Sequence, residues 1–150
     1  MLAREAYSYH DDPAVALFPE DRPVIFFDGV CVLCTGFVSY VLRNDRQDRF
    51  RFCTTQSPLG QAIYCHYGLE PVNSRTFLLL EDGVAVNKSD AALRAARHMW
   101  QPWPMARIFG LLPRFIRDGV YDFVARNRYK VFGKRDACMV PVQSDAARFL

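Results

Sequence analysis

The most informative stretch of the 150-residue sequence is Val24-Ile25-Phe26-Phe27-Asp28-Gly29-Val30-Cys31-Val32-Leu33-Cys34. Its first four residues are apolar and rich in strand formers, which is typical of a central strand covered on both faces. Asp28-Gly29 ends that strand, and the apolar residues from Cys34 to Leu42 follow helical spacing. The two cysteines therefore fall in the turn between a buried strand and an amphipathic helix.

Two cysteines separated by two residues at a helix start can close a small disulfide ring. The unpaired backbone N–H groups and the positive end of the helix dipole both stabilise a thiolate at the first cysteine. In such motifs the pKa of the first thiol falls from about 8.5 to roughly 3.5–7.5. We therefore expect Cys31 to attack a substrate disulfide, and Cys34, further in and more shielded, to resolve the mixed disulfide.

Asp28 stands three residues before Cys31, and two roles are open to it. Its carboxylate could accept a proton from Cys34 during resolution if burial raised its pKa. Alternatively, a side-chain oxygen of Asp28 could simply cap the turn or the helix, as aspartate commonly does.

The other three cysteines do not suggest a disulfide scaffold, because the total of five is odd and the chain is long enough to fold without staples. Cys53 and Cys65 are expected to be small core residues, although together with His66 they are available as ligands for a structural zinc ion. We favour the redox pair and expect neither a metal nor another cofactor. Cys138 follows the basic pair Lys134-Arg135, which favours a thiolate, and is a candidate third redox thiol or adduct site.

Strand and helix patterns alternate along the chain. They predict strands at 24–27, 50–53, 76–80 and 84–86, and helices at 34–42, 58–67 and 89–100. This β-α-β-α-β-β-α order is that of the thioredoxin core, an α/β fold. Two right-handed crossovers should place the first three strands in parallel, and a hairpin through Asp82-Gly83 should add an antiparallel edge.

A single domain is expected, because 150 residues with 51% hydrophobic side chains can bury one sizeable core. Residues 1–22 are predicted to be an irregular leader and 23–150 a thioredoxin-like domain. Its core covers about 23–100, and a C-terminal helical extension covers about 101–141. The apolar side of a helix at 118–132 should pack that extension on the core.

The helix after the hairpin begins at Ser89-Asp90, a position that faces the cysteine site in this fold. Its N–H groups could hold a carboxylate of glutathione or of a peptide, whereas the simpler interpretation makes Ser89 an ordinary N-cap. We include Ser89, Asp90 and Arg75, which precedes the third strand, as candidate substrate-binding residues.

These residues resemble the signature of the DCC family of predicted thiol–disulfide oxidoreductases, named for an aspartate and two cysteines. The likeness runs from about Val24 to Pro141. Beyond the opening stretch it is carried by Phe50-Arg51-Phe52 with Gln56-Ser57, by residues 88–93, by 121–129 and by 132–141. The resemblance implies that Asp28, Cys31 and Cys34 are the site residues and that the protein is of a bacterial, cytoplasmic type.

The sequence departs from thioredoxins proper just before the third strand. Thioredoxins place a cis-proline there, whereas this chain has Asn73-Ser74-Arg75-Thr76, and the nearest proline is Pro71. Because a cis bond at a non-proline residue costs about 2.5–4 kcal/mol, we predict a trans link and a different mode of substrate docking.

Charge is unevenly distributed: residues 101–150 hold 9 basic and 4 acidic side chains. Such a surface could meet an acidic partner, a membrane or nucleic acid, or could simply be solvated. No apolar run is long enough to span a bilayer, and the start of the chain lacks the features of a secretory signal. We expect a soluble, cytoplasmic protein with no nucleic-acid partner.

The sequence thus favours a thiol–disulfide oxidoreductase that exchanges the Cys31/Cys34 pair with a disulfide-containing protein or a glutathione-type thiol. The alternative is a non-catalytic adaptor with a thioredoxin fold, which would bind a partner through its basic helical extension.

Overall fold

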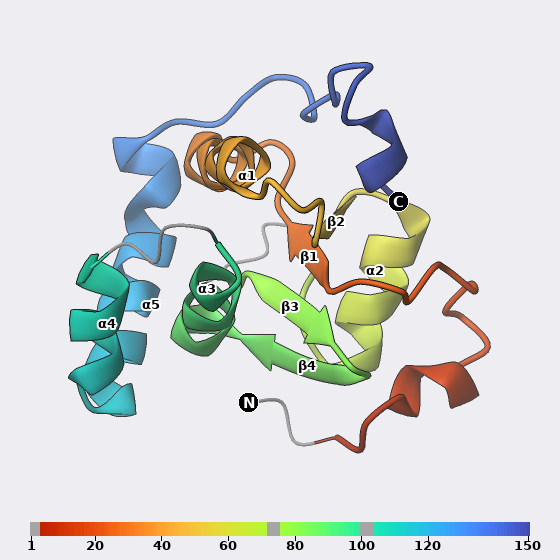
Figure 1. Ribbon diagram of the computed structural model, residues 1–150, viewed down its shortest axis with the longest axis horizontal. Helices are drawn as coiled ribbons and strands as arrows, with labels where there is room; N and C mark the ends of the chain where they lie inside the picture. Colours follow the sequence, from red (N-terminus) through yellow and green to blue (C-terminus); the bar gives the residue numbers. More distant parts are fainter. Residues whose placement is uncertain (1–3, 72–75, 100–103) are drawn as a thin grey trace.

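A four-stranded sheet forms the centre of the protein, with its strands in the order β2-β1-β3-β4 (Figure 1). The computed structural model describes residues 4–71, 76–99 and 104–150. The strands are β1 (Val24–Phe27), β2 (Arg51–Thr54), β3 (Leu78–Glu81) and β4 (Val84–Asn87). All four residues of β1 are buried, as predicted for an apolar strand in the middle of a covered sheet.

The direction of β3 differs from the prediction. β1 pairs in parallel with β2 but antiparallel with β3, so the expectation of three parallel strands is wrong. Helix α2 (Pro58–His66) is followed by eleven residues, 67–77, before β3 begins. Since an extended chain covers roughly 3.3–3.6 Å per residue, this link is long enough to return the chain past the sheet and to enter β3 from its other end.

Side chains on the two faces of the sheet build two separate cores. Ile25 and Phe27 belong to the core under helices α1 (Val32–Asn44) and α3 (Lys88–Arg97). Val24 and Phe26 face α2 and the N-terminal segment. That segment was expected to be irregular, but it contains a short 3-10 helix at Ser8–Asp11, whose Tyr9 is buried in the second core.

Two local predictions agree with the structure and one does not. Asp82-Gly83 forms the turn of the β3–β4 hairpin, with φ angles of 48° and 73° that match the twist of the strands. Ser57 caps α2 by accepting a hydrogen bond from the N–H of Gly60. Ser89, however, is not the N-cap of α3. Asn87 holds that position, and the Ser89 hydroxyl donates to a carboxylate, a stronger acceptor.

The extension consists of α4 (Pro104–Leu111) and α5 (Arg114–Val131), and α5 packs against α3 (Figure 1). Polar contacts join α5 to the core. Asp118 accepts the bond from Ser89, Asp122 pairs with Lys88 at 2.9 Å, and the Tyr121 hydroxyl accepts from the N–H of Phe77.

The apolar side of α5 does not pack on the core as predicted. Its exposed apolar residues include Val120, Phe123, Val124 and Val131, which are 38–70% exposed. Ala125 and Arg128 are the buried residues of this helix. The polar contacts described above orient α5, and they outweigh the apolar pattern from which the sequence prediction was made.

The C-terminal tail crosses the molecule from α5 to the outer edge of β2 (Figure 1). Lys134 forms an isolated β-bridge with Cys31, and Phe149 forms another with Phe52. A buried ion pair between Arg148 and Asp45 holds the end of the tail. None of the described helices is long and apolar enough to cross a membrane.

Replacing Arg148 with methionine is expected to lower the free energy of unfolding by about 3 kcal/mol, because the carboxylate of Asp45 would be left buried without its cation. Urea denaturation measures this change. Asp21→Asn, which removes a half-exposed pair with Arg51, serves as the control and should cost less than about 1 kcal/mol. Equal losses in the two variants would contradict the account.

Candidate active site

Cys31 is the N-cap residue of α1, directly after the loop that leaves β1. Its backbone is extended, with φ −80° and ψ 121°, and its sulfur accepts the N–H of Cys34 at 3.4 Å. The Cys31 carbonyl receives the first helical hydrogen bond, from Thr35. The buried strand and the amphipathic helix therefore hold the first sulfur at the helix N-terminus, as the sequence predicted.

The pKa values of the two thiols are shifted in opposite directions. The pKa of Cys31 is lowered to about 6, chiefly because the Cys34 thiol donates a hydrogen bond to its sulfur. The N–H of Cys34 and the positive charge of Arg128 act in the same direction, while burial opposes them. The pKa of Cys34 is raised by that same hydrogen bond and by burial. One thiolate beside one retained proton is the arrangement that the predicted roles require.

The relative exposure of the two cysteines is the reverse of the prediction. Cys31 has 0% exposure, whereas Cys34 is partly exposed. The C-terminal tail covers Cys31 and causes this difference. Lys134 forms a β-bridge with Cys31, and the N–H of Arg135 donates to the carbonyl of Val30 at 2.7 Å. No local sequence pattern could show that a segment a hundred residues away covers the first sulfur.

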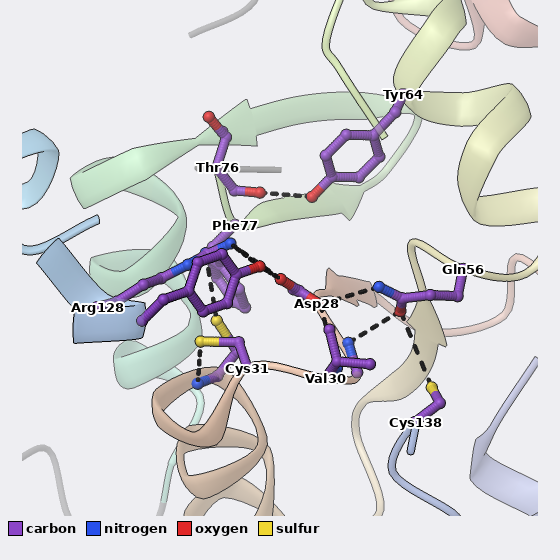
Figure 2. Close-up of polar contacts among 12 residues, drawn as sticks. Asp28, Val30, Cys31, Gln56, Tyr64, Thr76, Phe77, Arg128 and Cys138 are labelled. Atoms are coloured by element: carbon purple, nitrogen blue, oxygen red, sulfur yellow. Dashed lines mark hydrogen bonds and ion pairs between the residues drawn. The ribbon is translucent and has the colours of Figure 1, made fainter. Parts of the chain in front are cut away.

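Arg128 is a site residue that the sequence reasoning missed. Its side chain comes from α5 and is 5% exposed. One of its nitrogens, Nη1, donates to the sulfur of Cys34 at 3.5 Å, and Nη2 donates to Oδ2 of Asp28 at 2.9 Å (Figure 2). The only sequence signal was its place within the 121–129 segment of the family resemblance, because spacing along α5 pointed to the apolar side.

The carboxylate of Asp28 accepts hydrogen bonds from four side-chain or backbone donors. Oδ2 accepts from Arg128 and from the hydroxyl of Tyr129, and Oδ1 accepts from Gln56 and from the N–H of Val30 (Figure 2). The bond to Val30 corresponds to the predicted capping role. Within the described residues Asp28 has no hydrogen bond to Cys34, which the alternative role of proton acceptor would need.

Gln56 links Asp28 to Cys138. Its Oε1 accepts the N–H of Gly29 at 3.0 Å and lies 3.9 Å from the sulfur of Cys138 (Figure 2). A Cβ atom on residue 29 would lie only 2.3 Å from that sulfur, so any larger residue there would have to displace the side chain of Cys138. Cys138 thus lies against the Asp28-Gly29 turn, while Cys31 occupies the start of the helix.

The predicted substrate-binding residues lie in different settings. Ser89 lines a groove beside Val32 and donates its hydroxyl hydrogen to Asp118. Asp90 points to α5, where it pairs with Arg114 and Arg117 at 3.2 and 3.3 Å. Arg75, and with it the predicted trans link at 73–76, falls on a stretch largely outside the described residues.

The other cysteines lie apart from this arrangement. Cys53 is fully buried in β2, as predicted, whereas Cys65 is exposed on α2, which corrects the expectation of a core residue. His66, the third residue of the alternative zinc site, pairs with Asp12 at 2.8 Å. In the described part of the chain, no group of three or more histidine, cysteine or acidic side chains is placed to hold a metal ion.

Replacing Arg128 with methionine should raise the pKa of Cys31 by roughly one unit, because a cation beside the thiol pair is lost. The ultraviolet absorbance of the thiolate, followed against pH in the reduced protein, measures the shift. In the wild type the absorbance should fall as the pH drops through about 6. Arg128→Lys should keep part of the effect, and Arg126→Met, an exposed neighbour on α5, should match the wild type. A wild-type midpoint near 8.5 would contradict the assignment.

Comparison with known proteins agrees with this geometry. Residues 25–134 match the family described as DCC1-like thiol-disulfide oxidoreductase. YuxK, an uncharacterized protein of Bacillus subtilis (strain 168), is 41% identical over 127 residues, which cover 85% of this chain and 93% of the relative. A chloroplastic DCC family protein of Arabidopsis thaliana is 38% identical over 125 residues, or 82% of this chain and 73% of the relative. No solved structure matches the chain. The family resemblance is confirmed, and the chain belongs to the DCC1-like thiol-disulfide oxidoreductase family.

Proposed function

We propose that this protein exchanges its Cys31/Cys34 dithiol with a disulfide of a protein or of a glutathione-type substrate. The observation that carries the proposal is the cysteine pair at the start of α1, where the sulfur of Cys31 accepts the N–H of Cys34 at 3.4 Å and Arg128 donates to the sulfur of Cys34 at 3.5 Å. The lowered pKa of Cys31 and the raised pKa of Cys34 agree with this arrangement. Family membership supports a redox role for the chain.

In the first step the Cys31 thiolate attacks one sulfur of the substrate disulfide. A bond forms between Cys31 and that sulfur, the substrate S–S bond breaks, and the second substrate sulfur leaves as a thiolate that takes a proton from water. A pKa of about 6 keeps Cys31 largely ionised at neutral pH, so the nucleophile needs no separate base.

In the second step Cys34 attacks the sulfur of Cys31. Once Cys31 is bound to substrate its negative charge is gone, and the Cys34 proton loses its acceptor. The guanidinium of Arg128, 3.5 Å from the Cys34 sulfur, then favours the Cys34 thiolate. Closure of the Cys31–Cys34 disulfide releases the substrate sulfur that was bound to Cys31, which takes up the proton given up by Cys34 and leaves as a thiol. Two electrons pass to the substrate, and an external thiol must reduce the protein again.

Asp28 acts in this scheme as a positioning residue. Its Oδ2 atom accepts a hydrogen bond from Nη2 of Arg128 at 2.9 Å, and its Oδ1 atom accepts the N–H of Val30. These two bonds fix the position of Arg128 and the conformation of the loop before Cys31. Direct proton transfer from Cys34 to Asp28 stays a prediction. So does a redox role for Cys138, whose sulfur lies against Gly29 and Gln56.

Access to Cys31 requires movement of the tail. The sulfur has no exposed surface while Lys134 bridges Cys31. Gly133, with φ 89°, is the residue where the chain turns from α5 into the tail. A substrate disulfide can reach Cys31 only if residues 133–135 shift away from the start of α1.

Substituting Cys31 with serine should abolish the oxidation of the reduced protein by oxidised glutathione, measured as release of reduced glutathione. Cys34→Ser should stop at a mixed disulfide with glutathione on Cys31, visible by mass spectrometry. Cys65→Ser, which removes an exposed cysteine away from the site, should react like the wild type.

Glutathione release that is independent of Cys31 would overturn the proposal and would leave the adaptor function, in which the basic extension binds a partner. The cytoplasmic location also stays a prediction, because the name of the Arabidopsis relative places that protein in the chloroplast.

A further inference from the structure

A large apolar groove lies between α1, α3 and α5, with a volume of about 800 Å³. Its walls include Val32 and Phe37 of α1, Leu93 of α3, and Val124 of α5, and Phe132 lies just after α5. This volume falls within the range of ligand-binding clefts, roughly 300–1,000 Å³. Because α5 supplies one wall, the groove depends on the helical extension and is not a property of the thioredoxin-like core alone.

The groove is continuous with the redox motif. Val32 and Leu33, which both line it, are the two residues between Cys31 and Cys34. At the same end Phe132 lies directly before Gly133, where the tail that covers Cys31 begins. A substrate whose disulfide reaches Cys31 therefore has its neighbouring residues at the mouth of the groove.

The walls of the groove favour an apolar ligand. Among the described lining residues Arg117 carries the only formal charge, and its guanidinium pairs with Asp90. Phe132 and Val124, on the rim, are 47% and 38% exposed and therefore have apolar surface left to cover. Along these apolar walls a charged segment would lose water, whereas an apolar segment would be stabilised. Nη1 of Arg117, which is buried without a hydrogen-bond partner among the described residues, is a donor at the groove for a polar group of the bound segment.

The dimensions of the groove suit a short piece of extended chain. It follows α1 from Val32 to Tyr40, which spans about 12 Å at 1.5 Å per residue. An extended peptide covers that length with about four residues. We propose that the groove binds an apolar segment of about four residues next to the reactive cysteine of a protein substrate. This inference rests on the proposed function, because it concerns the substrate of the same cysteine pair.

Two peptides that carry the same cysteine, disulfide-linked to the same chromophoric thiol, test the proposal. One has four leucine or valine residues beside the cysteine, and the other has four serine or glycine residues. In single turnover by the reduced protein, the peptide and the chromophore leave as thiols and the protein is oxidised to the Cys31–Cys34 disulfide. We expect the second-order rate constant to be on the order of tenfold higher for the apolar peptide, because several apolar side chains become buried.

Two substitutions on neighbouring positions of α5 locate the effect. Val124→Asp places a charge in the wall of the groove and should reduce the ratio of the two rate constants to about one. Phe123→Asp changes a side chain that is 69% exposed and does not line the groove, so it should keep the wild-type ratio. The ratio is internal to each variant, and a general loss of activity or of folded protein therefore cancels from it.

Each of the other outcomes overturns a defined part of the proposal. Equal rate constants in the wild type would contradict the apolar segment while leaving the proposed function intact. Failure of both peptides to react would contradict the proposed function itself. If Val124→Asp abolishes self-association in sedimentation, or abolishes binding to phosphatidylglycerol vesicles, the occupant is a second copy of this chain or a lipid surface, and the substrate assignment is wrong.

Discussion

The buried ion pair between Asp28 and Arg128 joins the two parts of this molecule. Asp28 ends the central strand, Arg128 lies on α5 one hundred residues later, and both side chains are at most 5% exposed. A buried charge without a partner is strongly unfavourable, so each of these groups requires the other. Their pairing places α5 beside the cysteine motif and puts a guanidinium against the sulfur of Cys34. The helical extension is therefore part of the site.

The Cys31 thiol combines a lowered pKa with a buried sulfur. The helix start, the thiol of Cys34 and the charge of Arg128 lower the pKa of Cys31, which stabilises the reduced form of the pair. The tail at Lys134 covers the same sulfur, so the proposed exchange requires that the tail move away from the start of α1.

Local physical chemistry explains what could be predicted from the sequence. The apolar run before Cys31, the Ser57-Pro58 helix start and the Asp82-Gly83 turn each act within a few residues, and each appears in the structure as predicted. The roles of Asp28, Cys31 and Cys34 stay predictions, although the geometry around them agrees with exchange chemistry.

The wrong predictions about β3, Cys31 and α5 depended on distant segments. The length of the link after α2 allows β3 to run antiparallel to β1, and the C-terminal tail covers Cys31. Polar contacts orient α5, so Arg128 faces inward, while apolar residues expected in the core, such as Val124, stay partly exposed along the groove beside α1 and α3. The residue pattern along one helix cannot show which side of that helix faces a buried carboxylate on another element.

Equilibrium titration of the protein with mixtures of reduced and oxidised glutathione tests the central claim most directly. Mass spectrometry of the quenched, digested protein reports the linkage at each ratio. The account predicts one two-electron transition, in which a disulfide between Cys31 and Cys34 replaces the two free thiols without change at Cys53. Absence of that disulfide at every ratio, with Cys31 either unmodified or bound only to glutathione, would contradict it.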